Sequence, residues 1–153
     1  MSPEKQPGHI AVPNLIALYA EAIDAGDFDR VADLLADAVI TTEGTDTRVT
    51  GRDGVFAMYD TWTRRYEDDG TPHTNHVTTN LILDIDEDAG TASARSYFTV
   101  LQATPDLPLQ PIITGRYRDT FTRDADGAWR FATRHMVTTH NGDLTHHLKI
   151  PLG

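Results

Sequence analysis

Three residues in the first half of the chain carry side chains suited to acid–base chemistry: Tyr19, Asp24 and His76. Asp24 falls in the last turn of an expected helix, where the helix dipole disfavours a carboxylate, and Lys or Arg would be the commoner choice. His76 falls on an expected strand, on a face shared with Thr78 and Asn80. A carboxylate beside an imidazole fixes the tautomer and orientation of the ring, which can then exchange protons near neutral pH.

Each of the three residues also has a plain structural interpretation. Asp24 and His76 are residue types that usually face solvent, and Tyr19 lies on the apolar stripe of its expected helix, where it would pack in the core. Residue type alone leaves both interpretations open.

Helical spacing predicts three helices in the first half of the chain. The first begins near Pro13 and ends at Gly26, and Asp27 is the expected N-cap of the second. The third starts near Asp53 and ends before residues 68–72. Apolar residues at helical spacing carry these predictions: Leu15, Leu18, Ala22 and Ile23; Phe28, Val31, Leu34 and Leu35; Val55, Tyr59, Trp62 and Tyr66.

The second half of the chain changes to the two-residue period of strands. A short strand at 38–43 and an edge strand at 48–50 precede the third helix. Long strands are expected at 74–86, 91–103, 112–123 and 128–139, with a Pro-rich loop at 104–111. Helices followed by an antiparallel meander indicate an α+β fold.

These elements divide the chain into three parts. Residues 1–12 are expected to be a flexible lead, residues 13–140 one domain, and residues 141–153 a tail that crosses a pocket mouth or packs on another subunit. The absence of cysteine excludes disulfides and thiol catalysis.

The charge balance argues against two classes of partner. With 23 acidic and 13 basic residues, the net charge of −10 repels nucleic acids and anionic membranes. No apolar run approaches the roughly 18 residues that span a bilayer, and the first residues lack the apolar core of a secretion signal. We therefore expect a cytoplasmic protein.

Four segments together resemble the SnoaL-like proteins of the nuclear-transport-factor-2-like superfamily. They are residues 22–28 (AIDAGDF), residues 51–55 (GRDGV), His76 with Asn80, and the paired segments 115–119 (GRYRD) and 127–131 (GAWRF). The resemblance covers roughly residues 14 to 137. It implies a cone: three helices packed on a strongly curved antiparallel sheet that encloses a pocket.

This superfamily includes scytalone dehydratase, bile-acid 7α-dehydratase, ketosteroid isomerase, polyketide cyclases and the non-catalytic β subunits of ring-hydroxylating dioxygenases. The resemblance to the dehydratases implies that Asp24 lines the pocket, that His76 is catalytic and that Tyr19 polarises a substrate carbonyl. The sequence departs from scytalone dehydratase where that enzyme has a second catalytic His, which would fall near Thr99 or Leu101.

Further residues are candidates for the pocket lining. On the third helix and the long strands they are Tyr59, Trp62, Asn80, Tyr97, Arg116, Tyr117 and His135. No metal is expected, because His73 and His76 are three apart on a strand and point to opposite faces. Phosphate-binding and serine-hydrolase motifs are absent, so no cofactor is expected.

Two functions fit these predictions. The first is a cofactor-independent lyase or isomerase, of the dehydratase or cyclase type, acting on a small, mostly apolar, oxygenated ring compound, single or polycyclic. The second is a non-catalytic binding or assembly subunit, whose pocket would be filled by side chains and in which Asp24 and His76 would lie apart. Incomplete polar alternation on the long strands predicts a homo-oligomer in either case, with a dimer expected and a trimer as the alternative.

Overall fold

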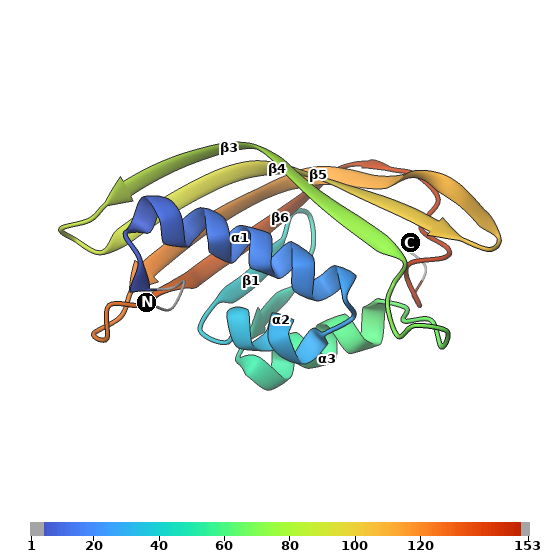
Figure 1. The fold of residues 1–153 in the computed structure, drawn as a ribbon, viewed down its shortest axis with the longest axis horizontal. Coiled ribbons are helices and arrows are strands. Elements are labelled where there is room, and N and C mark those ends of the chain that lie inside the picture. The colour runs from blue at the N-terminus through green and yellow to red at the C-terminus, as the bar shows by residue number, and fades with distance from the viewer. Residues whose placement is uncertain (1–4, 151–153) are drawn as a thin grey trace.

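The computed structural model describes residues 5–150 as three helices packed on one face of a six-stranded sheet (Figure 1). The helices are α1 (Gly8–Asp24), α2 (Phe28–Leu34) and α3 (Arg52–Trp62). The strands are β1 (Val39–Thr42), β2 (Arg48–Thr50), β3 (Thr74–Asp86), β4 (Thr91–Thr104), β5 (Leu107–Arg123) and β6 (Trp129–Asn141).

The sheet has the order β2-β1-β6-β5-β4-β3, and its strands pair antiparallel except β1 with β6, which are parallel. It curls over α1 without closing on itself (Figure 1). The predicted α+β cone is confirmed.

Helix α1 begins five residues before Pro13, the start expected from the sequence. The backbone N–H of Gly8 donates to Glu87 Oε1 at 2.5 Å, and a Cβ at Gly8 would lie 2.8 Å from the Trp129 ring. These contacts with the far end of the sheet hold the extra turn. Residues 8–12 are therefore helical, with Gly8, Ala11 and Val12 buried, and do not form the predicted flexible lead. Residues 1–4 of that lead lie outside the described chain.

The junction of α1 and α2 places Asp24 at the end of its helix. Gly26 has φ of +70°, a left-handed conformation that glycine adopts without strain, and a Cβ there would lie 2.2 Å from the Gly70 carbonyl oxygen. Asp27 caps α2, as predicted, by accepting a hydrogen bond from the Arg30 N–H at 3.0 Å. The chain therefore turns sharply directly after Asp24.

Strand β5 is longer than predicted, because the Pro-rich segment expected as a loop is part of it. Leu101 of β4 pairs with Pro111, and Thr104 pairs with Leu107. The pairing of β5 with β6 ends at Ile113 and Asn141, so one side of the Pro-containing stretch has no strand partner. A proline lacks the N–H that an inner strand would need, and it is tolerated on such a free side.

A bulge in β3 decides which side chains face the helices. The register shifts between Thr79 and Ile82, where Asn80 has a left-handed φ of 55°. Before the bulge, the more buried side chains are those of the row that includes Thr74 and His76. After it, the row changes parity and Leu83 becomes the more buried residue.

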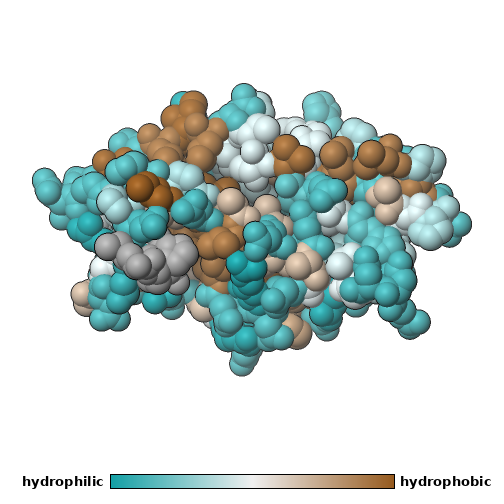
Figure 2. All heavy atoms as spheres, in the orientation of Figure 1, coloured by the Kyte–Doolittle hydropathy of each residue, from teal (hydrophilic) through white to brown (hydrophobic). Residues whose placement is uncertain are grey.

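The opposite face of the sheet carries several exposed apolar residues. Brown side chains gather on the upper side of the molecule in Figure 2, the side where β3 and β4 run in Figure 1. On β3 and β4, the large apolar side chains that are exposed are Val77, Leu81, Ile82 and Tyr97. A dimer through such a face stays a prediction. Within residues 5–150, no helix is both long and apolar enough to cross a membrane.

Candidate active site

Asp24 and His76 meet at the end of α1 and the start of β3. His76 Nδ1 lies 2.6 Å from Asp24 Oδ1, and the backbone N–H of His76 donates to Asp24 Oδ2 at 2.7 Å. The Thr74 hydroxyl also donates to Oδ1, at 2.8 Å. Their side chains are only 18% and 6% exposed for Asp24 and His76, respectively. A carboxylate accepts all three bonds, so Nδ1 of His76 carries a proton, and in the neutral ring Nε2 is the nitrogen that can accept one.

His76 lines a cavity of about 190 Å³ between the helices and the sheet. Its wall is mostly apolar, with Ile23, Met58 and Phe98 among its members. Tyr19 and Tyr59 supply hydroxyl groups, and the Tyr59 hydroxyl oxygen lies 2.8 Å from that of Tyr19. The site thus combines one base with phenol hydroxyl groups in a mostly apolar cavity.

The phenols of Tyr59 and Tyr117 are kept neutral by their surroundings. Burial raises the pKa of Tyr59 well above its ordinary value, and the neighbouring Tyr19 adds to the effect. The pKa of Tyr117 is raised by the same two causes in the same order. Neutral phenols donate hydrogen bonds, so these side chains suit a substrate oxygen that gains negative charge.

A buried cation lies against the tyrosine rings. Arg134, fully buried, makes two hydrogen bonds to the buried Asp119, at 2.9 and 3.0 Å. Its guanidinium carbon lies 4.3 Å from the Tyr19 ring centre and 3.8 Å from that of Tyr117. Burial disfavours the charged form of Arg134, but Asp119 outweighs burial, so the pKa of Arg134 is raised. This charge fixes the rings that carry the cavity's hydroxyl groups.

The segment after β6 closes one side of the cavity. Leu144, His147 and Leu148 are part of its lining. His147 is 7% exposed, and its Nδ1 has no hydrogen-bond partner among the described residues. Burial and then the nearby His76 lower the pKa of His147 to about 4, so its ring is neutral at pH 7.

The other predicted pocket residues separate into two groups. Tyr59, Trp62 and Tyr117 line the cavity. The remaining four lie outside its lining: Asn80, Tyr97, Arg116 and His135. Strand alternation explains the position of Arg116, because its neighbour Tyr117 faces inward. On the outer face, the Arg116 guanidinium carbon lies 4.8 Å from the centre of the Tyr97 ring. Asn80 forms the bulge, and His135 bonds to Glu43 at 2.7 Å.

Sequence reasoning missed His147, Arg134 and most of the apolar lining. The signals for His147 were the adjacent histidines 146 and 147 and the expectation that the 141–153 tail crosses a pocket mouth or packs on another subunit. Arg134 occupies an inward position because the β5–β6 register shifts, pairing Thr120 with Thr133 but Phe121 with Phe131.

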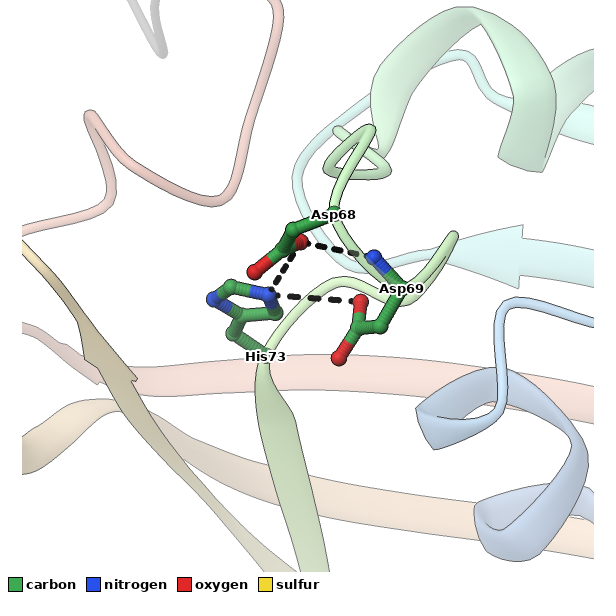
Figure 3. Close-up of side chains that lie close together, drawn as sticks. All are labelled: Asp68, Asp69 and His73. Carbon is green, nitrogen blue, oxygen red and sulfur yellow. Dashed lines mark hydrogen bonds and ion pairs between the residues drawn. The ribbon is translucent and has the colours of Figure 1, made fainter.

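One group of metal-ligand types occurs in residues 5–150, at Asp68, Asp69 and His73 (Figure 3). His73 Nε2 lies 2.9 Å from Asp68 Oδ1 and 3.3 Å from Asp69 Oδ1. The Thr71 backbone N–H, which donates to Asp69 at 2.9 Å, is the main reason that the pKa of this carboxyl is lowered. The acids are exposed, and the bonds shape the turn that leads into β3.

The chain matches the family model of the SnoaL-like domain over residues 9–135. It belongs to the SnoaL-like family. None of the curated proteins compared with it matches.

Similar solved structures include a candidate scytalone dehydratase from Novosphingobium aromaticivorans, at 24% identity and a TM-score of 0.68, covering 94% of this chain and 91% of that one. LinA, at 22% identity and a TM-score of 0.68, covers 95% and 93%. A protein from Catenulispora acidiphila in complex with S-DNPA, at 27% identity and a TM-score of 0.65, covers 83% and 90%. The family model thus shows the family of this SnoaL-like protein, and these structures show that they share its fold.

Proposed function

We propose that this SnoaL-like protein is a cofactor-independent lyase or isomerase that moves a proton next to the carbonyl group of a small, mostly apolar ring compound. The observation that carries the proposal is the 2.6 Å contact between Asp24 and His76 at the wall of a mostly apolar cavity. An oriented base in such a site is the minimum that enolisation requires.

Each group has a role that follows from its contacts. His76 Nε2 removes the proton from the carbon beside the carbonyl, and Asp24 stabilises the imidazolium that forms. The hydroxyl groups of Tyr59 and Tyr19 are hydrogen-bonded to each other, so one of them donates to the carbonyl oxygen as it becomes an enolate and the other donates to that hydroxyl. The imidazolium then returns its proton, either to another carbon, which gives an isomer, or to a leaving hydroxide, which gives water and a conjugated ketone.

Two relatives support this class of chemistry. One is described as a candidate scytalone dehydratase, and another, in complex with S-DNPA, supports a ligand-binding pocket. A binding or assembly subunit, in contrast, would be expected to have a filled pocket and separated Asp24 and His76 side chains. The open cavity and the Asp24–His76 contact favour the enzyme.

The test is turnover of cyclic β-hydroxy ketones, starting with 3-hydroxycyclohexanone, followed by the ultraviolet absorbance of the conjugated product. His76→Gln should lower kcat by about 10²- to 10⁴-fold, the usual contribution of a general base. His140→Gln, which changes an exposed histidine on β6, is the matched control and should leave kcat unchanged. If the wild type turns the ketol over and His76→Gln does so at the same rate, His76 is not the base.

A further inference from the structure

The backbone around His147 is held in place on both sides of the residue. The Arg64 N–H donates to the His147 carbonyl at 2.8 Å, and the Lys149 N–H donates to the Trp62 carbonyl at 2.9 Å. The preceding carbonyl, that of His146, accepts from the Tyr66 hydroxyl at 2.5 Å and from Gln102 Nε2 at 3.1 Å. The imidazole of His147 therefore has a defined position in the cavity wall.

One polar atom of that imidazole, Nδ1, has no partner among the described residues. Nδ1 is buried without a hydrogen-bond partner in the part of the chain that the structure describes, and the ring lines the cavity shared with His76 and Tyr59. A buried polar group without a partner destabilises a folded protein, whereas an apolar side chain in the same place would not. Because the lowered pKa keeps the ring neutral, it offers one donor and one acceptor, on its two nitrogens.

We propose that His147 is a substrate-binding residue that forms a hydrogen bond with a second oxygen of the ring substrate. The first oxygen is the carbonyl oxygen bound at the hydrogen-bonded Tyr59–Tyr19 pair. This assignment rests on the proposed function. Two oxygens at separate points of one cavity fix the orientation of the ring, so the carbon-bound proton faces His76.

The size of the cavity limits the substrate class. An apolar cavity of about 150 Å³ holds one benzene, so a cavity of about 190 Å³ fits one substituted ring. Of the ring ligands expected from the sequence, the proposal therefore concerns the single-ring class. A single ring with a carbonyl and a hydroxyl two carbons away satisfies both hydrogen-bonding sites.

The elimination balances for such a β-hydroxy ketone. His76 takes the proton from the carbon between the two functional groups, and the electron pair of that C–H bond becomes the new C=C bond through the enolate. The C–O bond held near His147 breaks, and the hydroxide takes the proton from the His76 imidazolium. The products are the conjugated ketone and water, and His76 is again a free base.

The experiment compares two unreactive rings, resorcinol and phenol, as probes. Resorcinol carries two oxygens with the 1,3 spacing of a β-hydroxy ketone, and phenol carries one. We expect resorcinol to bind the wild type roughly three- to tenfold more tightly than phenol in a calorimetric titration, the effect of one additional hydrogen bond. His147→Phe should abolish this preference. His146→Phe should retain it, because the His146 ring is not part of the cavity lining.

The wild type provides a second measurement if His147→Phe does not fold. Resorcinol, but not phenol, should shift the ¹⁵N resonances of the His147 ring. Equal affinity of the wild type for the two probes, or a preference that persists in His147→Phe, would overturn the inference while leaving turnover by His76 untouched. Binding preference without turnover of any ketol would instead refute the proposed function and retain His147 as a ligand contact.

Discussion

Asp24→Asn should invert the tautomer of His76. Three donors face the carboxylate: the Thr74 hydroxyl, the His76 Nδ1–H and the His76 backbone N–H. A carboxamide has one oxygen and one NH₂ group, so it cannot accept from all three. The backbone N–H cannot become an acceptor, so the amide oxygen must face it. The NH₂ group then faces His76 Nδ1, which has to lose its proton and accept.

The consequence is a site without its base. In the inverted tautomer the proton of His76 is on Nε2, the nitrogen that the wild type leaves free for substrate. An Asp-to-Asn change that imposes the wrong tautomer on a catalytic histidine lowers kcat by about 10⁴-fold, and we expect a loss of 10³- to 10⁴-fold on the same scale. The free energy of unfolding should fall by about 1–3 kcal/mol, because buried bonds to a charged acceptor are weakened.

Nitrogen-15 NMR of the imidazole ring measures the tautomer without any substrate, and ketol turnover measures its effect. Glu21→Gln on the same helix is the control, since its exposed carboxylate pairs only with Arg30 among the contacts described. A protonated Nδ1 in Asp24→Asn, or a loss of kcat below tenfold, would show that Asp24 does not set the tautomer.

Two further predictions concern stability. Asp119→Ala leaves the Arg134 guanidinium buried without its counter-ion, so chemical denaturation should show that the free energy of unfolding falls by about 3–5 kcal/mol. Glu21→Ala, which removes an exposed ion pair, is the control and should change the free energy of unfolding by less than about 1 kcal/mol. A small effect of Asp119→Ala would mean that water reaches Arg134. The pKa of His147 falls from 6.5 to about 4 on folding. Between these pH values the unfolded state therefore binds more protons than the folded state. Up to about 3 kcal/mol of stability that is present above pH 6.5 should be lost as the pH falls to 4. His147→Phe should remove this part of the pH dependence in denaturation curves measured at pH 7 and 4.5; parallel curves for variant and wild type would contradict it.

Local patterns in the sequence determined the elements and the end of α1. Gly26 and Asp27 need no partner elsewhere to turn the chain, because one tolerates a positive φ and the other caps the next helix with its own side chain. Asp24 and His76 were selected by chain position and by family resemblance. Their separation along the chain did not predict the distance between their side chains in space. That distance depends on how α1 lies on the sheet that contains β3.

Tertiary structure decided which strand residues face the cavity and what closes it. Alternation gives the two faces of a strand but does not say which face is inside, and a bulge exchanges them: the one at Asn80 lets both His76 and Leu83 face the helices although they differ in parity. His147 reaches the cavity only because the tail pairs with the chain after α3. Such contacts between distant segments leave no periodic trace in the sequence, since only the folded sheet and helices bring the segments together.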